Sequence, residues 1–158
     1  MFNSVEGTFY FEGSALANDS SNRRLSLSDG TGNNRVTINY SSSNNIQIYF
    51  INPIRPNFTP TFAIDITQNA KIAISWSSSK VNFYVNGSLV AEDLANSSFP
   101  INTLDIVKFK DGGGGLDWYA NTKALQVFNT QLTGTELEEL TSYTSFNAMA
   151  TSLNYTII

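Results

Sequence analysis

The sequence predicts an all-β protein in which two antiparallel sheets form a jelly-roll sandwich, followed by one or two short C-terminal helices. Two observations support this prediction. Apolar residues alternate with polar ones over many short runs, and turn residues such as Asn86-Gly87 separate the runs. Many short strands with frequent turns are typical of sandwiches and jelly rolls. The length of 158 residues fits one domain.

The first half of the chain contains four predicted strands. They lie at 8–13, 23–28, 35–40 and 46–51. In the first of them Phe9 and Phe11 alternate with polar neighbours, and the polar loop at 41–45 suits a hairpin. Three prolines at 53, 56 and 60 then predict an irregular crossover, because proline cannot donate a backbone hydrogen bond to a sheet.

The second half of the chain continues the same pattern. Strands are predicted at 71–76, 81–85, 88–92, 103–110 and 118–128. Asn86 and Gly87 both tolerate the positive φ of a type I′ turn. The strand after them should therefore return antiparallel to the strand before them.

Helix is predicted only after Thr133. This residue stands three positions before Glu136, as in a capping box, and apolar residues follow on one face. The spacing of Phe146, Met149 and Leu153 by three and four favours a second short helix. We therefore divide the chain into a domain at 1–142 and a C-terminal helix and tail at 143–158, packed on the domain or on a neighbouring protomer.

The composition excludes several classes of function. Net charge is −4, so no basic surface is expected to attract nucleic acid or an anionic membrane. The sequence has no cysteine and no histidine, which excludes disulfides, thiol chemistry and every histidine-dependent triad or metal site. Its polarity comes from Asn, Ser and Thr. That composition suits a surface that meets hydroxyl-rich ligands, although the same residues are common in turns and exposed strands.

Two segments resemble the laminin G-like and pentraxin-type branch of the concanavalin A-like lectin and glucanase superfamily. The first is KIAISWSSSKVNFYVNGSLV at 71–90, with Tyr-Val-Asn-Gly at its hairpin. The second is LDWYANTKALQVFNTQLTGTELEEL at 116–140, where a closing strand precedes a short turn and an acidic helix start. The resemblance implies a lectin-like, concanavalin A-like jelly roll over residues 1–142.

Other segments resemble versions of this domain in bacteriophage tail-fibre proteins. They are EGTFYFEGSALA, NRRLSLSDGTGNNRVTINY and FNAMATSLNYTII. This resemblance implies a non-catalytic carbohydrate-binding or receptor-recognition module for host attachment, in a virion tail or outside the cell. Its expected partners are a cell-surface or extracellular polysaccharide, other virion proteins and further copies of itself. The alternative is a structural module that joins an assembly through protein contacts and has no glycan ligand.

We expect no enzymatic activity. Glycosidases of the superfamily carry a Glu-x-Asp-x-x-Glu or Glu-x-Asp-x-Glu strand, and this sequence contains neither motif. Glu6 and Glu12 stand at opposite ends of one predicted strand, which separates them by far more than the roughly 5 Å of a retaining pair.

The strand alternation predicts a first group of candidate ligand residues. If the apolar positions face the core, the polar positions between them face outward. Aromatic rings can stack on sugars, and amide or guanidinium groups can bond hydroxyls. The candidates are Arg35, Asn39, Gln47, Tyr49, Asn82 and Tyr84. The alternative is a solvated face or one that another protomer covers. If Tyr49 and Tyr84 share one concave face, Tyr84→Ala should weaken glycan binding and change stability little.

The loop DGGGGLDWY at 111–119 predicts a second candidate site. Its glycines allow backbone amides to approach a ligand closely. The side chains that flank them are Asp111, Asp117, Trp118 and Tyr119. The loop is a candidate sugar site, or a Ca²⁺ site in which Asp29 joins Asp111 and Asp117. The alternative is a flexible connector with Trp118 packed in the core.

Overall fold

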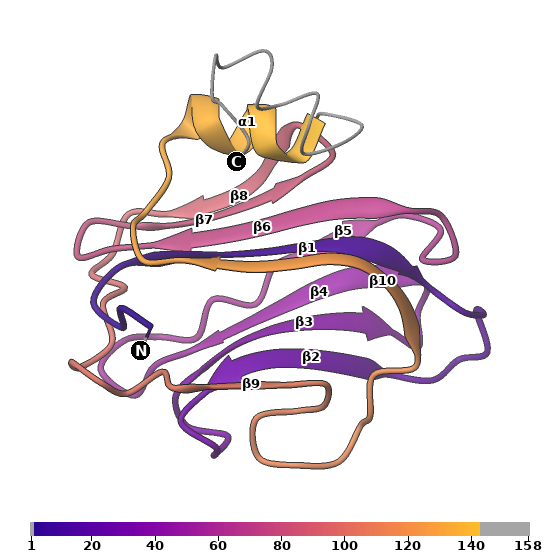
Figure 1. The fold of residues 1–158 in the computed structure, drawn as a ribbon, viewed down its shortest axis with the longest axis horizontal. Helices are drawn as coiled ribbons and strands as arrows, with labels where there is room; N and C mark the ends of the chain where they lie inside the picture. The colour runs from indigo at the N-terminus through magenta and orange to yellow at the C-terminus, as the bar shows by residue number, and fades with distance from the viewer. Residues whose placement is uncertain (1, 143–158) are drawn as a thin grey trace, which may run out of the picture.

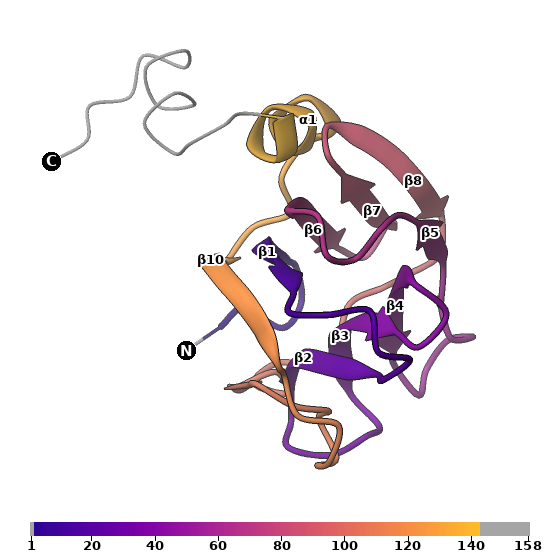
Figure 2. The same ribbon diagram turned by 90° about the vertical axis from the view of Figure 1, so that its right-hand side faces the viewer.

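Residues 2–142, which the computed structural model describes, form two five-stranded antiparallel sheets packed face to face (Figures 1 and 2). Sheet A has the order β10-β1-β6-β7-β8 and sheet B the order β5-β4-β3-β2-β9. The strands of sheet A are β1 (Gly7–Ala15), β6 (Ala70–Trp76), β7 (Val81–Val85), β8 (Ser88–Asp93) and β10 (Ala120–Phe128). Those of sheet B are β2 (Arg23–Ser28), β3 (Arg35–Ser41), β4 (Asn45–Ile51), β5 (Thr61–Ala63) and β9 (Ile106–Lys108). The predicted fold class is confirmed.

The core lies between the sheets and contains the alternating apolar residues that the sequence predicts. From sheet A these include Phe9, Phe11, Ile72, Ile74, Trp76, Val81, Phe83 and Val85, and from sheet B Leu25, Leu27, Val36, Ile38, Ile46, Ile48 and Phe50. Each strand hides one face from water, and burial of apolar area is the main driving force for folding. Every second side chain of these strands must therefore point away from the core.

The turn at Asn86-Gly87 has the predicted geometry. Both residues have positive φ, at 49° and 81°, and Val85 pairs directly with Ser88. The Asn86 side-chain oxygen accepts from the Lys71 backbone N–H at 2.9 Å, which joins the turn to β6. The irregular crossover is also found: residues 52–60 contribute only the bridge between Phe50 and Phe58.

One helix, α1 (Gly134–Ser142), follows β10 within the described residues and begins with the predicted capping box. The Thr133 N–H donates to Glu136 Oε2 at 2.7 Å, and the Glu136 N–H donates back to Thr133 Oγ1 at 3.3 Å. No helix in this part of the chain is long and apolar enough to cross a membrane. The second helix predicted at 146–153 lies outside the described residues.

Helix α1 packs on the outer face of sheet A, beside β6, β7 and β8 (Figure 1). Leu137 and Leu140 meet Tyr10, Ala73 and Tyr84 in a second, smaller apolar cluster. Tyr84 points away from the main core as predicted, yet it is only 4% exposed because the helix covers it. The exposed position that the sequence suggested for this ring is therefore wrong, and its burial predicts a larger contribution to stability.

We predict that Tyr84→Ala lowers the free energy of unfolding by about 2 to 5 kcal/mol, because it leaves a cavity between the helix and sheet A. Tyr84→Phe keeps the ring and should stay within about 0.5 kcal/mol of the wild type. Urea unfolding of both variants checks this. Phe83→Ala, in the main core, is the positive control. Wild-type stability in Tyr84→Ala would show that α1 does not pack on this ring.

Candidate functional site

The outer face of sheet B brings together four of the predicted ligand residues. Arg24 of β2 lies opposite Asn39 of β3, and Asn39 lies opposite Gln47 of β4. In the same way Ser26, Thr37 and Tyr49 form a row, and Ser28 lies opposite Arg35. Arg35, Asn39, Gln47 and Tyr49 therefore occupy one surface, with Arg24 added from β2.

Asn82 and Tyr84 do not belong to this surface. They lie on β7, which is in sheet A, whereas Tyr49 lies on β4, which is in sheet B. The outer faces of the two sheets point in opposite directions (Figure 2). A shared face for Tyr49 and Tyr84 is therefore wrong: the sequence predicts which way each ring points from its strand but not which strands share a sheet.

An ionic cluster, formed by Arg24, Arg35, Tyr49 and Asp111, is the main feature of the sheet B surface. Asp111 accepts at 3.1 Å from Arg35 Nη1, and its other oxygen lies 3.3 Å from Arg24 Nη1. The Arg24 guanidinium stacks over the Tyr49 ring at 4.5 Å from its centroid, and that of Arg35 lies at 5.8 Å. Cation–π contact and ion pairing thus hold two planar cations in fixed orientations.

The glycine-rich loop folds back on sheet B to deliver Asp111. The Asp111 N–H donates to the Gly115 carbonyl at 3.1 Å, and the Gly114 N–H donates to the Asp111 carbonyl at 2.9 Å. Gly114 and Gly115 have φ of 102° and 73°, which glycine adopts without strain. A Cβ on Gly112 would lie 2.6 Å from the Thr31 carbonyl oxygen. The glycines therefore allow a tight turn that docks on the β2–β3 loop.

The side chains of Lys108 and Ser26 anchor the glycine-rich loop to sheet B. Lys108 Nζ donates to the carbonyls of Gly30 and Gly112 at 3.2 and 3.0 Å. The Ser26 hydroxyl donates to the Lys110 carbonyl at 2.8 Å. The loop is thus fastened to β2 and its neighbours rather than free, which differs from the flexible connector that the sequence left open.

The remaining loop candidates are divided between core and surface. Trp118 is buried, stacks on Tyr40 at 5.0 Å and meets Phe11 edge-on at 5.1 Å. It is a core residue, as the alternative interpretation held, and is not available to a ligand. Asp117 and Tyr119 are exposed beside the loop. Asn39 is fully buried and donates to Asn22 at 3.3 Å, so it supports the surface rather than forming it.

The predicted calcium site is not assembled. Asp29 accepts from the Thr31 N–H and hydroxyl and from Asn34, which closes the β2–β3 loop. Burial alone would raise the pKa of the Asp29 carboxyl, but these hydrogen bonds outweigh it and lower the pKa. Asp111 faces two arginines. Among residues 2–142 no three acidic side chains gather at a position that could hold a metal ion, so Asp29, Asp111 and Asp117 do not form one site.

Sequence reasoning missed Arg24. The signal was present, because Leu25 and Leu27 point inward and the period of two then directs Arg24 outward. Its importance depends on pairing with β3 and on the loop that brings Asp111 to it, and both are long-range contacts.

Comparison with known protein families agrees with this fold. The chain belongs to the concanavalin A-like lectin/glucanases superfamily, since the family model Laminin_G_3 matches residues 5–138. A search of curated proteins found no significant match.

Several solved structures share the fold. The CBM40 module of the Ruminococcus gnavus IT-sialidase, solved with α2,3 sialyllactose, is 16% identical with a TM-score of 0.70, covering 88% of this chain and 83% of that one. A heptameric SAP-like pentraxin from Limulus polyphemus is 16% identical with a TM-score of 0.68, covering 90% of this chain and 72% of that one. A leech intramolecular trans-sialidase is 17% identical with a TM-score of 0.68, and the match covers 90% of this chain but only 24% of that one.

We predict that Asp111→Ala lowers the free energy of unfolding by about 1 to 3 kcal/mol, because it leaves two largely buried guanidinium groups without their shared carboxylate. Asp117→Ala, an exposed aspartate of the same loop, is the matched control and should stay within about 0.5 kcal/mol of the wild type. Chemical denaturation measures both. Equal stability of the two variants would contradict the structural role given to Asp111.

Proposed function

We propose that this protein is a non-catalytic carbohydrate-binding module that uses the outer face of sheet B. The observation that carries the proposal is the ionic cluster, in which Asp111 and Tyr49 hold two guanidinium groups in place. Each planar guanidinium can donate two parallel hydrogen bonds to paired hydroxyls or to a carboxylate. Because the protein already fixes their orientation, a ligand loses less side-chain entropy on binding.

The charge of the surface favours an acidic saccharide. The ionic cluster carries two positive charges, on Arg24 and Arg35, against one negative charge on Asp111. The surface therefore keeps a positive balance, although the whole chain carries −4. A carboxylate on the sugar can pair with that positive charge. On β4 the Tyr49 hydroxyl donates to Gln47 Oε1 at 2.7 Å, which leaves the Gln47 NH2 group and the Tyr49 oxygen for neutral groups of the sugar.

Comparison with the Ruminococcus gnavus module supports this class of ligand. That module was solved with α2,3 sialyllactose, which carries a carboxylate. At 16% identity the likeness concerns the fold. The arginine pair of this chain supplies the separate chemical reason for testing the same sugar.

Absence of catalysis is part of the proposal. Retaining and inverting glycosidases need one carboxylic acid that donates a proton and a second carboxylate on the other side of the bond. The carboxylate of the ionic cluster, Asp111, is instead engaged by two arginines. It serves to position cations in this account.

We further propose that the module acts in host attachment as part of a bacteriophage tail fibre or a similar adhesin, in the virion tail or outside the cell. Support comes from the sequence resemblance of the segments at 6–17, 22–40 and 146–158 and from the polar composition rich in Asn, Ser and Thr. Virion proteins and further copies of the chain are its proposed partners.

A purely structural role is the second candidate, and exposed apolar side chains favour it. Ile54 and Leu94 are both exposed, and each is adjacent in sequence to one member of the Arg55–Asp93 ion pair. They therefore lie at the same end of the sandwich, where a protein partner could cover them. In this alternative the domain joins an assembly and has no glycan ligand.

We predict that the domain binds α2,3-sialyllactose or another acidic glycan on an array and binds lactose, the neutral control, much more weakly. Arg35→Gln and Tyr49→Ala should each weaken binding by about 1 to 3 kcal/mol, or about 5- to 150-fold in Kd. Calorimetric titration measures this. Lys80→Gln, on the opposite sheet, is the matched control and should bind like the wild type.

Thermal unfolding of each variant is the control that separates a loss of binding from a loss of folding. Unchanged affinity in both Arg35→Gln and Tyr49→Ala would show that the binding site is not on the outer face of sheet B. Failure of every glycan on a broad array to bind would favour the structural alternative.

A further inference from the structure

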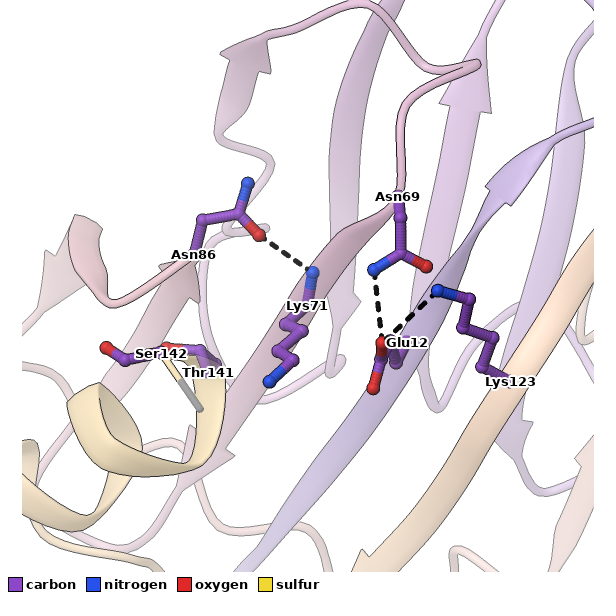
Figure 3. Close-up of a pocket in the computed structure, with 7 residues that line it drawn as sticks. All are labelled: Glu12, Asn69, Lys71, Asn86, Lys123, Thr141 and Ser142. Carbon is purple, nitrogen blue, oxygen red and sulfur yellow. Dashed lines mark hydrogen bonds and ion pairs between the residues drawn. The ribbon is translucent and has the colours of Figure 1, made fainter. Parts of the chain in front are cut away.

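A pocket of about 400 Å³ opens on the outer face of sheet A (Figure 3). The ionic cluster lies on the other sheet, sheet B. Strands β1, β6 and β10, the β7–β8 turn and the end of α1 surround it. The residues that line it are Glu12, Asn69, Lys71, Asn86, Lys123, Thr141 and Ser142. Its volume is in the range of small-molecule sites in proteins, about 300 to 1,000 Å³.

Lys71 is the unusual residue of this pocket. It is 7% exposed, and its side chain lies between the end of α1 and Glu12 in Figure 3. Its backbone N–H bonds Asn86, but its ammonium makes no hydrogen bond or ion pair with any residue in 2–142. The ammonium nitrogen keeps access to solvent through the open pocket, where a counter-charge can pair with it.

Glu12 does not supply that counter-charge in full. It stands directly opposite Lys71 on β1, yet its oxygens are engaged by Asn69 at 3.1 Å, by the Tyr10 hydroxyl at 3.3 Å and by Lys123 at 3.8 Å. Two ammonium groups therefore share one carboxylate, and the pocket keeps a net positive charge. Burial lowers the pKa of Lys71, Glu12 partly opposes this effect, and Lys123 adds to it.

The other lining groups are suited to hydroxylated ligands. Asn69 donates to Glu12 and Asn86 accepts from the Lys71 N–H, which leaves the Asn69 oxygen and the Asn86 NH2 group for a ligand. The Ser142 hydroxyl donates to the Glu138 carbonyl at 2.5 Å, so its oxygen can still accept from a ligand hydroxyl. The Lys123 side chain lies at the opening of the pocket and is 61% exposed, so its ammonium can reorient toward a bound ligand. The pocket thus combines a lysine with a largely buried side chain, an exposed lysine and several neutral hydrogen-bonding groups.

We propose that this pocket binds a small oxyanion, a phosphate or carboxylate group free or carried on a monosaccharide. The anion bonds the Lys71 ammonium at the base of the pocket and Lys123 at its rim. Hydroxyls of an attached sugar bond Asn86 and Ser142. The site is independent of the proposed carbohydrate surface, because it lies on the other sheet and shares no residue with the ionic cluster.

The experiment titrates the full chain with inorganic phosphate, acetate, glucose 6-phosphate and, as the neutral control, glucose. Amide NMR shifts and thermal unfolding are recorded at constant ionic strength. We expect the phosphate-bearing probes to shift the Lys71, Asn86 and Ser142 amides and to raise the melting temperature, because a ligand that binds only the folded state stabilises it. Glucose should do neither. Stronger binding of glucose 6-phosphate than of phosphate identifies a sugar-borne anion.

Lys71→Met keeps most of the length and apolar packing of the side chain and removes the charge. It should abolish the thermal shift and weaken binding by about tenfold or more, while Lys123→Met has a smaller effect. Lys80→Met, a lysine of the β6–β7 turn outside the pocket, should behave like the wild type. If Lys71→Met does not fold, Lys71→Gln replaces it. Shifts of the Lys71, Asn86 and Ser142 amides that persist in the folded Lys71 variant, or the absence of shifts at these amides with every probe, would overturn the proposal.

Discussion

The apolar layer between the two sheets determines what each outer face can offer. Successive side chains of a strand point to opposite faces of the sheet. Because Phe83 and Ile48 point into the core, their neighbours Tyr84 and Tyr49 must point outward. A shift of one residue in any strand would bury its polar set and expose its apolar set. The register therefore fixes the positions of the ionic cluster on sheet B and of the charged pocket on sheet A.

The outer faces of the two sheets are covered in different ways. On sheet A the outward residues include Tyr10, Ala73 and Tyr84, whose apolar area helix α1 covers. On sheet B the outward residues are mostly polar, and the glycine-rich loop meets them through Asp111 and backbone carbonyls. One face is thus closed by hydrophobic packing, whereas the other is organised by charge and keeps partly exposed guanidinium groups at its surface.

Local patterns predicted most of the fold, and long-range contacts explain what they missed. Alternation, the Asn86-Gly87 turn and the Thr133–Glu136 capping box depend on neighbours in the sequence, and each was found. Tyr84 was misread as a ligand residue because its burial comes from a helix some fifty residues later. Asp111 was read as a calcium or sugar ligand, since nothing local reveals that Arg24 and Arg35 meet it across 76 residues or more. Whether any residue binds a sugar stays a prediction.

The central claim is that ligands reach this domain through the charged face of sheet B. A map of amide NMR shifts on addition of α2,3-sialyllactose, or of the acidic glycan that an array selects, tests it most directly. The account predicts shifts in β2, β3, β4 and the loop at 111–119, grouped around Arg24, Arg35 and Tyr49, with β7 and β8 unchanged. Saturable shifts confined to sheet A, with none around the ionic cluster, would contradict it.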